Sequence, residues 1–133
     1  MIVREGHDVS IFACGIMTAQ ALEAADVLAK EGISAEVVNV STIKPIDAEK
    51  ILGSVRKTNC AVTAEEHSII GGLGSAVAEI LIDACPVPVE RVGVPDTFTE
   101  SGKPEQLLKK YGLSVDDIVS AAKLAISHKQ ERK

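Results

Sequence analysis

The stretch of sequence that decides the fold is residues 60–84, CAVTAEEHSIIGGLGSAVAEILIDA. Residues 60–64 are apolar or small and predict a buried strand, and residues 65–68 predict a polar loop. Glycines at positions 71, 72 and 74 predict a turn. The apolar residues that follow recur in steps of three and four and predict one helical stripe: Leu73, Ala76, Val77, Ile80, Leu81 and Ala84. In a parallel sheet, the predicted loop lies at the carboxyl edge, where α/β folds place ligand and partner contacts.

The alternation of strand and helix continues on both sides of this stretch. Apolar runs predict strands at residues 9–14, 35–40 and 89–94, with a short edge strand at residues 1–3. Helices are predicted at residues 18–30, after Asp47 as N-cap, from Pro104 to Tyr111, and after Ser114. This order predicts a three-layer α/β/α fold with a mainly parallel sheet and right-handed crossovers. Because no repeat or linker interrupts the pattern, residues 1–133 are interpreted as one domain.

The composition excludes several classes of protein. Aromatic residues make up only 2% of the chain, so the core must consist of Val, Ile, Leu and Ala, as in a parallel sheet covered by helices. A net charge of −5 argues against nucleic acid or an anionic membrane as partner. No apolar run approaches the roughly 20 residues of a membrane span. The lysine-rich end, residues 129–133, is expected to be frayed and solvated.

The three cysteines lie far apart and show no CxxC spacing. They therefore indicate neither a disulfide framework nor a zinc site. Cys14 and Cys60 fall in predicted strands, where a buried thiol behaves as a small hydrophobic group. This pattern is typical of a protein in a reducing cytoplasm.

The glycine turn is a first candidate for chemistry. Gly72, Gly74 and Ser75 stand where a helix begins, and free N–H groups at a helix start favour a phosphate or another anion. The turn matches neither GxGxxG nor GxxxxGK[ST], so it indicates no particular nucleotide. The alternative interpretation is structural: glycines allow a sharp turn and close packing of helix on sheet.

The acidic segment Glu65-Glu66-His67 is a second candidate. Carboxylates beside a histidine are typical of acid–base or metal chemistry. Adjacent residues of a strand point to opposite faces, so only Glu65 and His67 would share one, and a three-ligand cluster is not expected. Glu66 and His67 are then interpreted as a surface or subunit contact, or as the rim of an active site supplied by other polypeptide. Ser75 lacks a GxSxG elbow and is no nucleophile candidate.

Three motifs occur in order along the chain: TIKPID at residues 42–47, EEHSIIGGLGSAV at residues 65–77 and SGKPEQLL at residues 101–108. Together, and with the β/α units between them, they resemble the C-terminal domain of transketolase, including the split kind made of two chains. More distant resemblance is to deoxyxylulose-phosphate synthase and to the β chains of 2-oxo-acid dehydrogenases. The SGKP motif favours transketolase over those relatives.

The resemblance implies a five-stranded sheet whose first strand, near residues 1–4, runs antiparallel to the rest. It implies a thiamine-dependent enzyme, a homo-oligomer such as a dimer or a two-chain assembly, that transfers two-carbon ketol units between sugar phosphates such as pentose phosphates. Thiamine diphosphate and its divalent metal bind the N-terminal and middle domains of that family. No catalytic, cofactor-binding or metal-binding residue is therefore carried over to this chain, which alone should be inactive.

The resemblance makes the carboxyl edge the expected docking surface for those thiamine-binding domains. The candidate interface or anion-binding residues are Glu66, His67, Gly72, Gly74 and Ser75. Two alternatives stay open. One is a free-standing phosphate- or nucleotide-binding α/β module that uses the glycine turn, and the other is a hydrolase that uses Glu65 and His67.

Overall fold

The computed structural model describes residues 1–40, 46–68, 72–94 and 115–131. Its centre is a five-stranded sheet with the order β1-β3-β2-β4-β5. The strands are β1 (Ile2–Arg4), β2 (Val9–Ala13), β3 (Ala35–Asn39), β4 (Ala61–Ser68) and β5 (Val89–Val94). β1 pairs with β3 antiparallel, whereas all other neighbours are parallel. The predicted five-stranded, mainly parallel sheet with an antiparallel first strand is confirmed.

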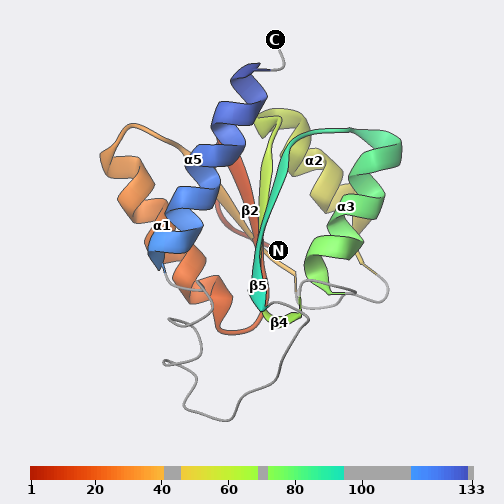
Figure 1. Ribbon diagram of the computed structural model, residues 1–133, viewed down its shortest axis with the longest axis horizontal. Helices are drawn as coiled ribbons and strands as arrows, with labels where there is room; N and C mark the ends of the chain where they lie inside the picture. The colour runs from red at the N-terminus through yellow and green to blue at the C-terminus, as the bar shows by residue number, and fades with distance from the viewer. Residues whose placement is uncertain (41–45, 69–71, 95–114, 132–133) are drawn as a thin grey trace.

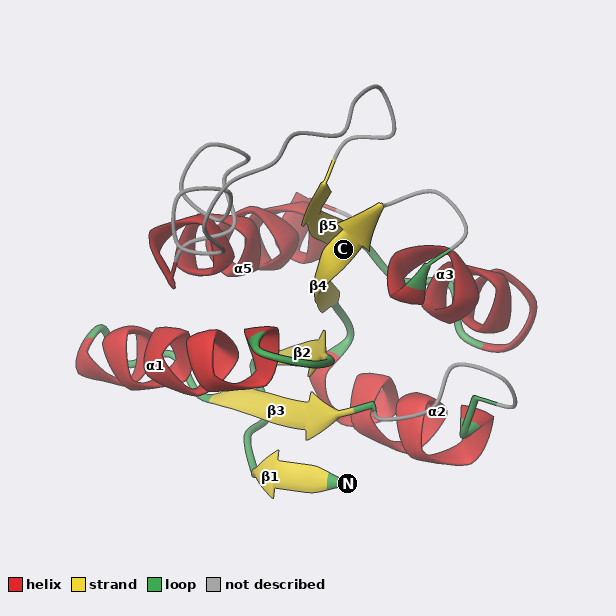
Figure 2. Cartoon of the chain, turned by 90° about the horizontal axis from the view of Figure 1, so that it is seen from below, coloured by secondary structure: helices red, strands yellow, loops and turns green. Residues whose placement is uncertain are grey.

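Helices cover both faces of the sheet and complete the three layers (Figure 1). α1 (Met17–Lys30) and α5 (Val115–Glu131) lie on one face, and α2 (Ala48–Thr58) and α3 (Leu73–Ala84) lie on the other (Figure 2). The α/β/α architecture predicted from the alternating pattern is therefore present.

The ends of α1 and α2 follow local sequence signals. Asp47 Oδ1 accepts a hydrogen bond from the Lys50 N–H at 3.2 Å, as expected of an N-cap. α2 ends at Asn59 in the left-handed region, with φ of 62°. Gly32, just beyond α1, also has a positive φ, of 79°, which a glycine adopts without strain.

The core consists of two apolar layers, one on each face of the sheet. β2 lies between them, and all five of its residues are buried. Ile11 faces the layer under α1 and α5, and Phe12 faces the layer under α2 and α3. Aliphatic and alanine side chains make up nearly all the rest, as the scarcity of aromatic residues predicts. Each fully buried Leu, Ile or Val contributes about 1.5–3 kcal/mol before entropy is counted.

Three expectations about local structure are wrong. The acidic segment is not a loop, because β4 continues to Ser68. Ala84 is exposed, and the buried stripe of α3 consists of Leu73, Val77 and Leu81 together with Gly74. Lys129 is not frayed, because α5 extends past it and its ammonium group is hydrogen-bonded.

Some expectations concern residues outside the described ranges. These are the loop at residues 41–45, the first glycine of the turn, the predicted helix at residues 104–111 and the Ser114 cap. In the part of the chain that the structure describes, no helix has both the length and the apolar character needed to cross a membrane.

Candidate functional site

The candidate residues lie at the carboxyl edge of the sheet, where the parallel strands end. β4 brings the backbone of Glu66 and His67 to this edge, and α3 begins beside it with Gly72, Gly74 and Ser75. Figure 2 looks at the molecule from this side, with the end of β4 next to the start of α3. The topology therefore brings the five predicted residues to one region.

Glu65 connects these two groups of residues. Its side chain is buried, with a relative exposure of 1%. Oε1 accepts a hydrogen bond from the Leu73 N–H, and Oε2 accepts one from the Gly74 N–H, each at 2.8 Å. The last part of β4 is thereby tied to the first turn of α3 through both carboxylate oxygens.

The Glu65 carboxylate takes the place that an external anion would occupy at the start of α3. A helix leaves its first N–H groups without intrahelical partners, and its dipole favours a negative charge there. Two of those N–H groups already donate to Glu65. A phosphate at this turn would have to displace or approach a buried carboxylate. The geometry therefore favours the interface interpretation of the turn over the anion-binding one.

The same geometry argues against the hydrolase alternative. A general base must reach the proton that it abstracts, directly or through one water molecule. Glu65 is buried and directs both oxygens at backbone N–H groups of α3. Its role in this chain is structural, because it ties β4 to the start of α3.

Gly74 allows α3 to pack closely on the sheet. A Cβ atom at Gly74 would lie 3.0 Å from Thr63 Oγ1 and 3.1 Å from Arg91 Cδ. Thr63 precedes Glu65 by two positions on β4, so both side chains lie on the α3 face. Gly74 thus has the packing role that the sequence left open. Gly72 has φ of −97°, outside the region that favours glycine.

Two exposed apolar side chains at this edge were missed by the sequence analysis. Ile16, in the turn between β2 and α1, is 44% exposed, and Met1 is 63% exposed. The Met1 backbone pairs with Asn39 at the end of β3, which places Met1 at the carboxyl edge. Neither residue belongs to an apolar stripe, and the only signal was the position of Ile16 two residues after the predicted strand at residues 9–14.

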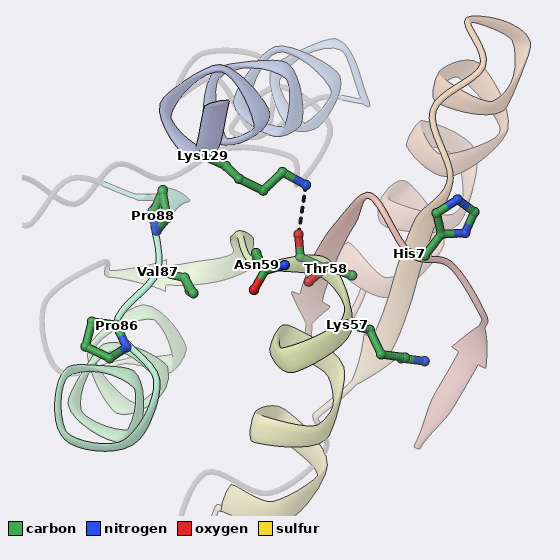
Figure 3. A pocket seen from close by; sticks show the side chains of 8 residues that line it. All are labelled: His7, Lys57, Thr58, Asn59, Pro86, Val87, Pro88 and Lys129. Atoms are coloured by element: carbon green, nitrogen blue, oxygen red, sulfur yellow. Dashed lines mark hydrogen bonds between the residues drawn. The ribbon is translucent and has the colours of Figure 1, made fainter. Parts of the chain in front are cut away.

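The opposite, amino edge of the sheet holds a cavity of about 410 Å³ (Figure 3). It is lined by His7, Lys57, Thr58, Asn59, Pro86, Val87, Pro88 and Lys129. The two lysines already have acceptors within the chain. Lys129 Nζ donates to the Asp8 and Thr58 carbonyl oxygens at 2.7 and 2.8 Å, and Lys57 Nζ donates to Glu36 Oε1 at 2.5 Å. Since both ammonium groups already donate to acceptors of the chain itself, this cavity is a weaker candidate site.

Two buried titratable groups lie near the amino edge. Burial raises the pKa of the Glu36 carboxyl, but hydrogen bonds, from Lys57 above all and also from the Gly6 N–H, leave that pKa below its usual value. Burial raises the pKa of the Cys60 thiol to about 11. Cys60 Sγ donates to the Asp8 carbonyl oxygen at 3.3 Å. Glu36 therefore stabilises the fold as a carboxylate, and Cys60 stabilises it as a neutral thiol.

Comparison with known proteins places this architecture in a family. A sequence profile described as "Transketolase, C-terminal domain" matches residues 1–118. The chain is 56% identical to the 6-deoxy-6-sulfo-D-fructose transketolase subunit SqwH of Clostridium sp. (strain MSTE9), covering 91% of this chain and 38% of that protein. It is 45% identical to 1-deoxy-D-xylulose-5-phosphate synthase 1 of Geobacter sulfurreducens (strain ATCC 51573 / DSM 12127 / PCA), covering 96% of this chain and 20% of that protein.

A solved structure agrees with these relatives. The protein titled "Split gene transketolase, inactive beta4 tetramer" superposes with a TM-score of 0.92 at 55% sequence identity. The match covers 97% of this chain and 42% of that one. The chain thus spans less than half the length of each relative described here. Sequence profile, relatives and fold agree: the chain belongs to the transketolase family and corresponds to its C-terminal domain.

Proposed function

We propose that this chain is the assembly domain of a thiamine-diphosphate-dependent transketolase and docks onto the thiamine-binding domains or subunit through its carboxyl edge. The family and the similarity to a transketolase subunit support this proposal. A single structural observation carries the choice of surface. The carboxyl edge presents the exposed apolar side chain of Ile16, which follows β2, next to the anchored end of β4, and that of Met1 farther along the same edge at β3. The lysines of the amino edge are instead bound internally.

The residues that the structure describes do not fit the cofactor itself. A diphosphate needs free N–H groups or cations, and the glycine turn at the start of α3 instead faces the Glu65 carboxylate. The described ranges contain no group of three or more His, Cys, Asp or Glu side chains placed to hold a metal ion. We therefore assign no catalytic step to this chain, and ketol transfer belongs to the neighbouring polypeptide.

Self-association and location are part of the same proposal. A relative of this fold is titled an inactive tetramer, which supports a homo-oligomer without activity when this chain is alone. Within the described residues, the cysteines carry thiols and form no disulfide, and Cys60 is buried, which supports a cytoplasmic location.

The proposal is tested by adding this chain to a thiamine-binding transketolase subunit and measuring two-carbon transfer between sugar phosphates. We expect no transfer by this chain alone and saturable activity when both are present. Calorimetry should detect no binding of thiamine diphosphate to the chain alone. Ketol transfer by the isolated chain, or a failure to stimulate any thiamine-binding subunit, would contradict the proposal.

A matched pair of variants tests the surface. Ile16→Asp places a charge on the proposed docking surface and should raise the subunit concentration for half-maximal activity by about tenfold or more. Ile82→Asp is the control, because Ile82 is 70% exposed on α3. It should leave that concentration within about twofold of the wild-type value. Equal effects of the two substitutions would exclude the carboxyl edge as the docking surface.

A second function is supported by one comparison, the 45% identity to a 1-deoxy-D-xylulose-5-phosphate synthase over 96% of this chain. In that case the same domain would serve an enzyme that forms 1-deoxy-D-xylulose 5-phosphate. Measuring both products with the assembled enzyme distinguishes the two. Formation of that product without ketol transfer between sugar phosphates would favour the synthase.

A further inference from the structure

We propose that Glu65 is a positioning residue for docking: its buried carboxylate sets the placement of the β4 end against the start of α3, and so forms the surface that the partner recognises. This inference rests on the proposed function. Glu65 touches neither substrate nor cofactor in this account, and it acts through the residues that follow it on β4 and those that begin α3.

The connection is geometric. Residue 65 lies on β4 directly before Glu66 and His67, and its two oxygens bind the N–H groups of Leu73 and Gly74. Two bonds to successive N–H groups fix the orientation of the first turn as well as its distance from the strand. The first turn of α3 is therefore held in register with the last residues of β4.

The packing around Glu65 leaves little room for another arrangement. A Cβ atom at Gly74 would lie only 3.0 Å from Thr63 Oγ1 on β4 and 3.1 Å from Arg91 Cδ on β5, so a larger residue would not fit there without a shift. Leu73 is fully buried in the layer between the sheet and the α2 and α3 helices. Because a carboxylate is costly to bury without donors, the two N–H groups and the helix dipole are what make its position favourable.

Glutamine is the substitution that isolates this role. It has nearly the shape of glutamate, but its amide offers one acceptor oxygen and one NH₂ donor. In Glu65→Gln, one of the two helix N–H groups loses its acceptor and faces a donor. The start of α3 should shift away from β4 while the apolar core of the domain stays intact.

The experiment uses the assembled enzyme. Wild-type and Glu65→Gln chains are titrated into the thiamine-binding subunit, and the concentration for half-maximal activity is measured separately from turnover at saturation. We expect Glu65→Gln to raise the half-saturation concentration about tenfold, with saturated turnover within about twofold of wild type. Circular dichroism checks that the variant is folded. If it does not fold, Glu65→Asp, whose shorter carboxylate cannot span both N–H groups, replaces it with the same expectation.

Two control variants separate positioning from general stability. Thr63→Val changes a buried side chain on the same face of β4, and Val55→Ala lowers stability at a buried position of α2. Both should dock with wild-type half-saturation. If Val55→Ala weakened docking as much as Glu65→Gln does, the inference would be overturned, because stability alone would then explain the effect.

The remaining outcomes are also decisive. If the wild-type chain docks and Glu65→Gln docks equally well, the positioning role is overturned, while the proposed function stands. A loss of saturated turnover at unchanged half-saturation would also overturn it, because the effect would then lie in the chemistry. Failure of the wild-type chain to dock would contradict the proposed function itself and the inference with it.

Discussion

At each edge of the sheet a charged side chain binds backbone groups, and the two side chains have opposite charges. At the carboxyl edge, the Glu65 carboxylate accepts hydrogen bonds from the N–H groups of Leu73 and Gly74. At the amino edge, the Lys129 ammonium group donates to the carbonyl oxygens of Asp8 and Thr58. In a parallel α/β fold, helices begin at one edge and end at the other, so one edge has free N–H groups and the other has free carbonyls. The sign of each charge fits that direction at the N–H groups that begin α3 and at the carbonyl of Thr58, the last residue of α2.

The two edges differ in their access to water. Glu65 is 1% exposed, so its carboxylate and the two N–H groups that it binds are shielded from bulk solvent. Lys129 and its acceptor Thr58 both line the open cavity at the amino edge, which water can enter. Glu65 and Lys129 both bind backbone groups, but removing one or the other should therefore have different consequences. The carboxyl edge depends on its charged side chain for its shape, whereas the amino edge should tolerate the loss of its own.

The largest effect that we expect comes from backbone spacing at the amino edge. A Cβ atom at Gly6 would lie 2.3 Å from the Ala35 carbonyl carbon and 2.5 Å from the Glu36 nitrogen. Gly6→Ala must push β3 and the chain before β2 apart, and it should lower the free energy of unfolding by about 3 kcal/mol in chemical denaturation. Gly53→Ala is the control: nothing lies within 4 Å of its Cβ, and α2 should gain about 0.5–1 kcal/mol. If Gly6→Ala were as stable as wild type, the backbone at the amino edge would also tolerate substitution.

The next effect depends on pH. The thiol of Cys60, a buried residue of the amino edge, has a pKa of about 11 in the folded chain against an ordinary value of 9.0. Between these values the unfolded chain loses the proton and the folded chain keeps it. The free energy of unfolding should therefore fall by about 1.4 kcal/mol per pH unit as pH rises through this window.

Cys60→Ala tests that origin directly. The difference in unfolding free energy between wild type and this variant should change with that slope above pH 9. If the unfolding free energies of wild type and Cys60→Ala changed with pH in parallel, the Cys60 thiol would not be the origin of the pH dependence.

A smaller effect is expected at Lys129. Lys129→Met keeps most of the aliphatic side chain and removes the ammonium group. Because water in the cavity can bind the freed carbonyls, the loss should be about 1 kcal/mol in thermal or chemical denaturation. Docking should be unchanged, in contrast to Glu65→Gln. Equal weakening of docking by the two substitutions would remove the functional distinction between the edges.

The smallest effect is expected at Thr63, beneath Gly74. Its hydroxyl group is buried and has no hydrogen-bond partner among the described residues. Thr63→Val replaces this group with a methyl of similar size, so the free energy of unfolding should change by less than about 0.5 kcal/mol, or rise slightly. A loss well above that value would reveal a hydrogen bond that the described contacts do not include.

Most of the fold could be predicted from the sequence because its signals are local or periodic. The alternating strands and helices, the Asp47 cap and Gly32 all depend on spacing of a few residues. The end of β4 could not be predicted in this way. Charged residues such as Glu65 are usually exposed, and only the arrival of α3, eight residues later, explains the burial of this one. Lys129 was misjudged for the same reason, since its acceptors are Asp8 and Thr58.

The sequence predicted where the candidate site lies better than it predicted how its residues interact. The rule for parallel sheets and the order of the elements place all five candidate residues at the carboxyl edge. The packing of Gly74 was one of two interpretations that the sequence left open. Ile16 and Met1 could not be identified, because an exposed apolar residue in a turn or at a chain end belongs to no periodic pattern. The docking roles of Glu66, His67 and Ser75 remain predictions.

Hydrogen–deuterium exchange of this chain, with and without the thiamine-binding subunit, tests the docking surface most directly. We expect the subunit to slow exchange of the backbone amides of Ile16 and of residues 66–68 at the carboxyl edge. Exchange of Asn59 and Val89 at the amino edge should be unchanged. Protection confined to the amino edge, with residues 66–68 unaffected, would contradict the central claim that this domain assembles through the edge that Glu65 holds together.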